Sequence, residues 1–239
     1  MKVIEVLCPE FSNMYADLYN ITYLSKCSKE IKVIYTSYGD KPYFMDNHVD
    51  MVYMGAVSDL KIPIIIDYLK EYKEKIKSLI EDNIMFFITG NSLEVFGKEI
   101  EESGSSYKAL GLFDYRIIKD MNNKHTSWFL GDFDNNYVIG YRGQYSICTV
   151  KDNLSFIKRI GGYGSDLKSD NEGIHYKNFF ATYLIGPFLI MNPYFTKFLL
   201  KKLGLKDDLI YEKEIMDAYN FRKDYFLKDG VRFDVGDHG

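Results

Sequence analysis

The feature that most constrains the fold of this chain is an uninterrupted apolar run at residues 84–88, Ile-Met-Phe-Phe-Ile. Polar residues 81–83 precede the run, and the small polar turn 89–91 follows it. A run of this length without polar alternation predicts a strand that is buried on both faces of a parallel sheet. Residues 93–97 would then begin a helix packed back on the sheet. Strand, tight turn and helix in this order predict a nucleophile elbow, which presents one side chain at the carboxyl edge of the sheet.

Strand and helix patterns alternate through the first half of the chain, and short strands dominate the second half. Strands are expected at 2–8, 31–36 and 49–54, and helices at 13–25 and 63–80. Further extended segments are expected at 109–113, 115–118, 127–130, 137–141, 145–150 and 173–184, with helices at 193–203 and 212–226. This order predicts a doubly wound α/β fold whose mixed, mostly parallel central sheet is flanked by helices and continues into an antiparallel extension. No linker or repeat interrupts the pattern, so one domain is expected over 1–239, with 205–239 as a candidate helical extension.

Composition excludes several classes of function. Hydrophobic residues make up 46% and charged residues 27% of the chain, which is typical of a globular protein. The net charge of −4 and the scattered basic residues give no support for nucleic-acid binding. The longest apolar stretch, 183–191, contains Gly186 and Pro187 and is too short to span a bilayer, so no membrane association is expected. Residues 2–7 have a strand pattern rather than that of a signal peptide.

Cysteine and histidine usage points to a cytoplasmic protein without a metal site. The three cysteines are widely spaced, which favours reduced thiols. The four histidines are scattered, and no metal-ligand spacing occurs. We therefore expect no metal and no cofactor.

Four segments in order resemble class I glutamine amidotransferases of the cobyric acid synthase type, a family related to cobalamin and cell-wall biosynthesis. That family includes the subunit that supplies ammonia to a Mur-ligase-like enzyme. Residues 14–21 resemble its "LYGDRGNI" segment, 54–59 its "GGGQD" loop, 88–98 its "CGGYQxLGK" turn, and 172–193 its "EGVxYKN…GTYLHGPLLxxNP" segment. The last match is the most specific. The resemblance implies a flavodoxin-like three-layer fold with an active site at the predicted elbow.

The departures from this family fall on its chemistry. The nucleophilic Cys of the family corresponds to Gly90 when spacing is counted back from Gly97, or to Thr89 when the following glycine is matched instead. The His of the family corresponds to Ile185. In the family, the thiolate attacks the glutamine amide and the His transfers the proton. Gly and Ile can do neither, so no catalytic residue is expected.

We therefore expect an atypical member of this type that lacks glutaminase activity and serves as a scaffold or regulatory subunit, with a Mur-ligase-like protein as its candidate partner. One alternative is an active amidotransferase with a displaced nucleophile, for which Thr89 and Cys8 are the candidates. Another is a module that binds a small molecule such as a glutamine analogue. Its candidate ligand-binding residues are Gly55, Ser58, Asn91, Ser92, Arg142 and Gln144.

Each of these residues also has a purely structural interpretation. Asn91 or Ser92 would cap the helix after the turn, and Ser58 would cap the helix after its own loop. Arg142 would lie on an exposed rim, and Glu94 would be a surface charge in the first turn of a helix. Cys148 would be buried and inert.

Overall fold

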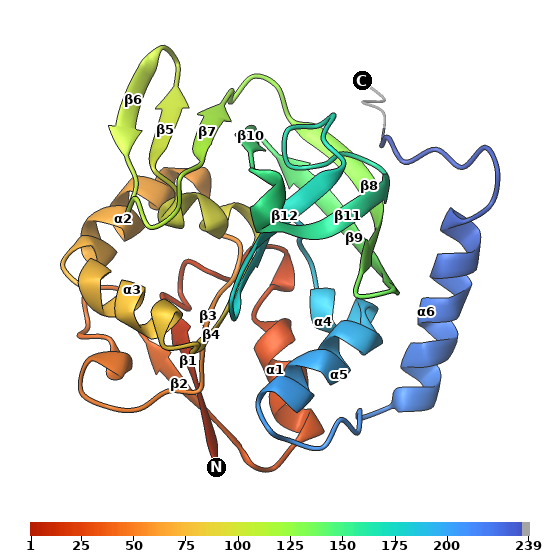
Figure 1. The fold of residues 1–239 in the computed structure, drawn as a ribbon, viewed down its shortest axis with the longest axis horizontal. Coiled ribbons are helices and arrows are strands. Elements are labelled where there is room, and N and C mark those ends of the chain that lie inside the picture. The colour runs from red at the N-terminus through yellow and green to blue at the C-terminus, as the bar shows by residue number, and fades with distance from the viewer. Residues whose placement is uncertain (236–239) are drawn as a thin grey trace.

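A nine-stranded mixed sheet forms the centre of the computed structural model, which describes residues 1–235 (Figure 1). The strands lie in the order β2-β1-β3-β4-β13-β12-β11-β8-β9. Their bounds are β1 Lys2–Leu7, β2 Ile31–Thr36, β3 Met51–Met54, β4 Met85–Thr89, β8 His125–Phe133, β9 Asn136–Gln144, β11 Ser155–Gly161, β12 Asn171–Tyr176 and β13 Phe179–Thr182. The five strands from β2 to β13 are parallel, and the pairings from β13 to β9 are antiparallel. This arrangement confirms the expected α/β class and its antiparallel extension.

The apolar run of β4 is buried on both faces, as predicted. Phe86 and Ile88 belong to one hydrophobic core, whereas Met85 and Phe87 belong to a second core on the opposite face. Helices α2 (Ile62–Lys70) and α3 (Lys73–Glu81) cover the first core; helices α1 (Tyr19–Cys27), α4 (Phe188–Met191) and α5 (Pro193–Lys202) cover the second (Figure 1). Because successive side chains of a strand point to opposite faces, a continuous apolar run supplies both cores at once.

Several element boundaries differ from the sequence expectations. The helix expected at 13–25 begins only at Tyr19, because Tyr15 and Ala16, within the preceding 3-10 turn η1 (Met14–Ala16), have left-handed backbone angles (φ 57° and 62°) that an α-helix does not contain. The helix expected at 63–80 is divided into α2 and α3, and each half buries its own apolar side chains against the sheet. The segment 173–184 is two strands rather than one, since Lys177 (φ 54°) turns the chain between β12 and β13.

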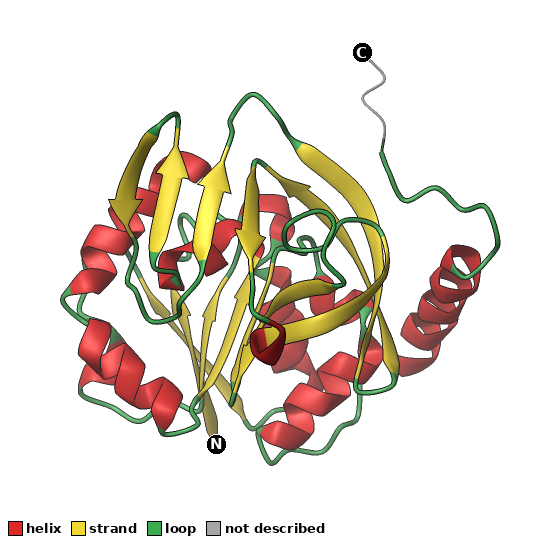
Figure 2. Cartoon of the chain, turned by 45° about the horizontal axis from the view of Figure 1, so that its top comes forward, coloured by secondary structure: helices red, strands yellow, loops and turns green. Residues whose placement is uncertain are grey.

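A second sheet, here called the accessory sheet, was not anticipated as a separate unit. It contains β10 (Ser146–Thr149), β7 (Arg116–Lys119), β5 (Glu99–Glu102) and β6 (Ser105–Lys108) in that order (Figure 2). Strands β5 and β6 were missed because their sequences are rich in charged and small polar residues. The segment expected at 145–150 is a strand, but it belongs to this sheet and not to the antiparallel extension. The accessory sheet packs on the 3-10 helix η4 (Gly90–Phe96), which follows β4.

The C-terminal part of the chain returns to the antiparallel strands. Helix α6 (Glu212–Phe226) confirms the helix expected at 212–226, and the tail after it runs alongside β8, where Trp128 donates its backbone N–H to the Phe233 carbonyl at 2.8 Å. The Phe233 ring covers Gly161, where an added Cβ would lie 2.4 Å from the ring. Residues 236–239 of the expected helical extension lie outside the described residues. Short 3-10 turns also occur at η2 (Tyr43–Met45), η3 (Asp59–Lys61) and η5 (Asp152–Leu154).

Candidate functional site

The elbow lies at the carboxyl end of β4, in the middle of the central sheet. Thr89 is still extended (φ −120°, ψ 154°), whereas Gly90 has a left-handed φ of +63°. A left-handed residue between strand and helix is what exposes a nucleophile in an elbow, and glycine adopts it without a Cβ penalty. Of the two alignments open at the sequence level, this geometry favours Gly90 as the position of the nucleophile.

Three loops meet at Gly90 and fill the space that a nucleophile would occupy. A Cβ added to Gly90 would lie 2.4 Å from the Ala56 Cβ, in the loop after β3, and 3.1 Å from the Ile185 Cγ2, in the loop after β13. Ala56 and Ile185 are only 2% and 3% exposed. The structure therefore brings together the two positions that the resemblance assigns to the nucleophile and the base. Where these two positions meet, the neighbouring atoms are aliphatic, namely the Ala56 Cβ and the Ile185 Cγ2.

The buried carboxylate of Asp17 connects the segments around Gly90 through hydrogen bonds. Asp17 accepts hydrogen bonds from the Thr89 hydroxyl (2.7 Å), from the Ala56 backbone N–H (2.8 Å) and from the Gly186 backbone N–H (3.0 Å). Burial raises the pKa of Asp17 to about 7, although these three hydrogen bonds oppose the shift. The Tyr53 hydroxyl lies 3.0 Å from the Thr89 hydroxyl. The backbone amides of Ala56 and Gly186 thus bond to a side chain of the protein itself. Sequence reasoning missed Asp17, although it lies in the first matched segment.

The candidate ligand-binding residues Asn91 and Ser92, which follow β4, form hydrogen bonds to the loop that follows β3. The Ser92 hydroxyl donates to the Gly55 carbonyl at 2.5 Å. Asn91 accepts from the Val57 backbone N–H (3.0 Å) and donates to Asp59 (3.2 Å). Neither Asn91 nor Ser92 caps η4, because Thr89 holds the N-cap position and makes no side-chain capping bond. Ser58 precedes η3 and also makes no capping bond.

Arg142 and Gln144, the remaining candidates, point inward from β9. Arg142 is fully buried, and its guanidinium donates to the carbonyls of Gly164 (2.6 Å), Ser146 (2.9 Å) and Ser165 (3.1 Å). Gln144 donates to the Tyr183 carbonyl at 3.0 Å. The expected rim position of Arg142 is therefore wrong, because the alternation of β9 turns this side chain into the protein. Ligand binding by any of the six candidates stays a prediction.

A buried ion triad joins the elbow helix to the accessory sheet. Glu94, expected at the surface, is fully buried, and its carboxylate lies 2.9 Å from the Lys119 ammonium, which also lies 2.8 Å from Asp59. Burial raises the pKa of Glu94. Burial alone would lower the pKa of Lys119, but the two carboxylates raise it above its ordinary value. Lys119 was missed at the sequence level. Its place two residues after the buried Ile117 in β7 was the available signal.

The thiols lie in environments that keep them protonated. Cys8 and Cys148 are buried, which confirms the expectation for Cys148, and burial raises the pKa of Cys8 to about 12 and that of Cys148 still further. Burial also raises the pKa of Cys27. Within residues 1–235, no imidazole is among the groups that shift the pKa of these thiols. The same part of the chain holds no cluster of three His, Cys, Asp or Glu side chains that could bind a metal ion.

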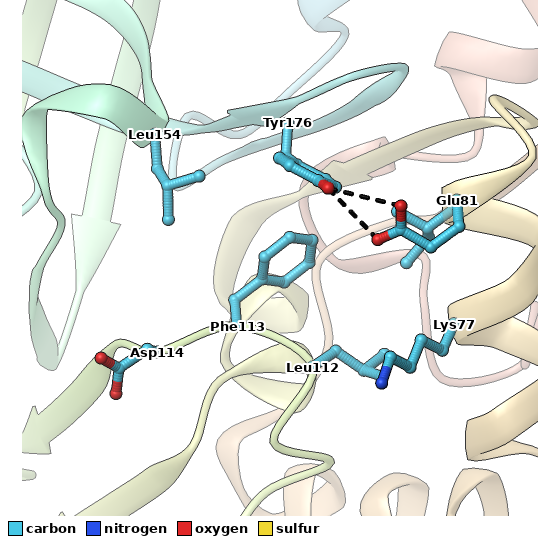
Figure 3. Close-up of a pocket in the computed structure, with 8 residues that line it drawn as sticks. Lys77, Glu81, Leu112, Phe113, Asp114, Leu154 and Tyr176 are labelled. Atoms are coloured by element: carbon cyan, nitrogen blue, oxygen red, sulfur yellow. Dashed lines mark hydrogen bonds between the residues drawn. The ribbon is translucent and has the colours of Figure 1, made fainter.

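A separate surface cleft lies near the amino ends of β4 and β13, away from the elbow. Its volume is about 220 Å³, and its walls come from α3, the loop 109–114, η5 and β12 (Figure 3). Phe113 forms part of the apolar lining, and the Tyr176 hydroxyl bonds to Glu81 at 3.2 Å across one end. Ligands of open α/β sheets bind at the carboxyl ends of the strands. This cleft is therefore not at the usual position of an active site.

Sequence comparison finds two curated relatives of similar length. The chain is 27% identical over 209 residues to the lipid II isoglutaminyl synthase (glutamine-hydrolyzing) subunit GatD of Staphylococcus aureus (strain N315), covering 86% of this chain and 85% of the relative. It is 29% identical over 231 residues to the GatD subunit of Streptococcus pneumoniae (strain ATCC BAA-255 / R6), covering 87% and 86%. No protein-family model matches the chain.

Solved structures similar in fold are glutamine amidotransferases. One such enzyme superposes with a TM-score of 0.56 at 12% identity, covering 84% of this chain and 99% of its own. A glutamine amidotransferase from Thermotoga maritima gives 0.51 at 11% identity, covering 93% and 92%. The glutaminase domain of Trypanosoma brucei CTPS, solved with acivicin, gives 0.52 at 9% identity, covering 86% and 95%.

Within residues 1–235, none of the helices is both long and apolar enough to cross a membrane. The chain has the class I glutamine amidotransferase fold, and in sequence it is similar to the GatD subunits.

Proposed function

We propose that this chain is a GatD-like subunit that does not hydrolyse glutamine and acts as a scaffold or regulatory component of a larger assembly. The observation that carries the proposal is the filled elbow. A Cβ added to Gly90 would lie 2.4 Å from the Ala56 Cβ, and Ile185 holds the position that the family resemblance assigns to the base. Glutamine hydrolysis of this type needs a nucleophile and a proton carrier within hydrogen-bond reach of one another. Gly90 and Ile185 supply neither group.

An ammonia-release assay on the purified chain tests the first half of this proposal. We expect no release from glutamine above the uncatalysed rate, while an active GatD relative assayed in parallel gives turnover. Loss of either triad member typically lowers kcat by about 10⁴–10⁶-fold. An assay that detects a rate about a thousandfold below that of the relative is therefore sensitive enough to distinguish an active chain from an inactive one. Release that scales with the amount of chain and disappears in Thr89→Ala or Cys8→Ala would contradict the proposal.

The second half concerns the partner. The relatives are named as subunits of lipid II isoglutaminyl synthase, and the family resemblance suggests a Mur-ligase-like protein. We expect such a protein, encoded near this chain, to co-purify with it as a stable complex. The experiment is size-exclusion chromatography of the co-expressed pair with mass measurement. Two proteins that elute separately at concentrations of tens of micromolar would refute the partner assignment.

One contact favours a second candidate function, hydrolysis with Thr89 as nucleophile. The Asp17 carboxylate lies 2.7 Å from the Thr89 hydroxyl, and its pKa of about 7 suits a general base. Against this candidate, both side chains are fully buried. Thr89→Ser, which keeps a hydroxyl, and Thr89→Ala distinguish the two functions. Activity that survives in the first variant and vanishes in the second would establish the second candidate.

A further inference from the structure

The first half of β8 extends beyond the strand that pairs with its second half. Strand β11 pairs with β8 only from Leu130 to Asp132, whereas β9 pairs with β8 over its whole length. Residues 125–129 therefore have no β11 residues opposite them on that side. A strand edge of this kind offers its backbone N–H and C=O groups to another extended segment. We call residues 125–129 the β8 edge.

A segment that follows α6 adds to this edge as a short antiparallel strand. Asp234 forms an antiparallel bridge with Ser127, and the Trp128 backbone N–H donates to the Phe233 carbonyl at 2.8 Å. We call residues 229–235 the tail segment. Its contact with β8 is the one that an extended peptide makes when it adds to an exposed sheet edge.

Two side chains of the tail segment have specific contacts at the edge. The Phe233 ring lies over Gly161, where an added Cβ would be 2.4 Å from the ring, and its centroid lies 5.4 Å from that of the Phe226 ring. The Asp234 carboxylate accepts a hydrogen bond from the Tyr163 hydroxyl. The edge therefore has a slot for an aromatic ring and, one residue further on, a donor for a carboxylate.

The tail segment is held loosely in comparison with the strands of the sheet. None of residues 229–235 is buried. Near its last described residue, the Thr126 hydroxyl donates to the Val235 carbonyl at 3.1 Å. Segments with few buried contacts open at a lower free energy than the core does. The tail segment can therefore leave β8 while the central sheet stays folded.

Exposed aromatic rings border the β8 edge. Trp128 is 39% exposed and Tyr225 is 50% exposed. The centroids of both rings lie close to that of Phe226, at 5.8 Å and 5.3 Å. Exposed apolar groups that gather at one place are typical of a protein–protein contact, and aromatic residues are enriched in such contacts.

We propose that the β8 edge is a strand-addition site for a partner protein, and that the tail segment occupies it until a segment of the partner takes its place. The partner segment is extended and carries an aromatic residue followed by an acidic one, as Phe233 and Asp234 do. In this binding mode the backbone hydrogen bonds supply affinity and the side-chain slots supply specificity. The inference rests on the proposed scaffold function for the existence of a partner, and it adds where that partner binds and what its segment contains.

A peptide added to the full chain tests the site. In Phe233→Ala the tail segment loses its ring, so the site becomes available and Trp128 becomes more exposed. The probe is a synthetic peptide with the sequence of residues 229–235, Asp-Gly-Val-Arg-Phe-Asp-Val. We expect it to bind Phe233→Ala saturably and to return the Trp128 emission toward the wild-type wavelength. The wild-type chain should bind it roughly tenfold more weakly or worse, because a tethered tail competes at an effective concentration on the order of 1 mM.

Two chain variants serve as matched controls, with circular dichroism as the check on folding. Gly161→Ala places a Cβ in the slot of the Phe233 ring, so it should shift the Trp128 emission as Phe233→Ala does, but the peptide should not reverse that shift. Phe221→Ala alters a side chain of α6 that is 76% exposed, and it should behave as the wild type does.

Two altered peptides define what the site recognises. The peptide that carries Phe233→Ala should not bind. A peptide with alanine everywhere except at the Phe-Asp pair should bind the Phe233→Ala chain within about tenfold of the native peptide, because the backbone contacts are retained.

The site is refuted if the native peptide shows no saturable binding to Phe233→Ala up to about 1 mM, or if the two peptides with and without the Phe ring bind equally well. Binding of the native peptide alone, without the alanine-substituted one, would restrict the site to the tail segment and overturn the assignment to a partner. These readouts involve neither glutamine nor a ligase, so their failure is distinct from ammonia release, which would contradict the proposed function and leave peptide binding unchanged.

Discussion

The close contact between Gly90 and Ala56 makes a quantitative prediction about stability. An alanine at position 90 would place its Cβ 2.4 Å from the Ala56 Cβ, whereas ordinary contact begins at 3.4 Å, so the two loops must separate by about 1 Å. Such overpacking typically costs about 1–3 kcal/mol. The left-handed φ of +63° adds about 1–2 kcal/mol for any residue with a Cβ. We therefore expect Gly90→Ala to lower the free energy of unfolding by about 2–5 kcal/mol.

A matched control and a double-mutant cycle separate these two costs. Gly104 has a similar φ of +77° but no heavy atom within 4 Å of an added Cβ, so Gly104→Ala should lose only the backbone share, about 1–2 kcal/mol. Ala56→Gly removes the colliding methyl group. In the Ala56→Gly/Gly90→Ala double variant, part of the overpacking share should be recovered as a favourable coupling, because the Ala56 Cα would still lie 2.9 Å from the added Cβ.

Urea unfolding of the four proteins in the cycle, followed by circular dichroism, measures this coupling. The reasoning is refuted if Gly90→Ala destabilises no more than Gly104→Ala does. It is also refuted if the single-variant losses at positions 56 and 90 simply add. Either outcome would mean that the elbow has room for a side chain and that the proposed loss of the nucleophile is not enforced by packing.

Three further predictions follow from the buried charges and the C-terminal tail. Because the pKa of Asp17 is raised in the folded protein, its contribution to stability is fully present below about pH 4 and is lost as the pH rises through about 7, at roughly 1.4 kcal/mol for each pH unit between these two values. Unfolding from pH 4 to 8 should show a steeper decline of stability in the wild type than in Asp17→Asn, which keeps the buried Glu94 with its own raised pKa. Lys119→Met leaves the Glu94 carboxylate buried without its cation and should lower the free energy of unfolding by about 3–5 kcal/mol. The double variant Lys119→Met/Glu94→Gln should recover part of this loss, and equal stability of the single and double variants would contradict the pairing. Phe233→Ala should release the segment after α6 from β8. The fluorescence of the single tryptophan, Trp128, should then shift to longer wavelength without a large loss of helicity. An unchanged emission spectrum would contradict the packing of this segment against β8.

The course of the chain through the central sheet could be predicted because the signals there are local. A continuous apolar run at residues 84–88 can supply side chains to two hydrophobic cores only as a buried strand. The sequences of α5 and α6 have helical patterns that few other secondary structures fit. The accessory sheet was harder to anticipate. Its strands β5 and β6 are stabilised by their neighbours and by η4 rather than by their own composition, which is a tertiary effect that strand propensity does not contain.

Part of the candidate site could also be predicted from local sequence signals. The sequence alone showed that Gly90 or Thr89, and Ile185, hold the positions that the family resemblance assigns to a Cys and a His, because residue identity is visible without coordinates. Only the tertiary structure decided that Gly90 and not Thr89 holds the left-handed position, and that Ala56 occupies the space beside it. It also decided that Glu94 and Arg142 lie inside the protein. The physical reason is that burial and close contact depend on segments far apart in the chain, and residue type and local spacing do not specify how those segments meet.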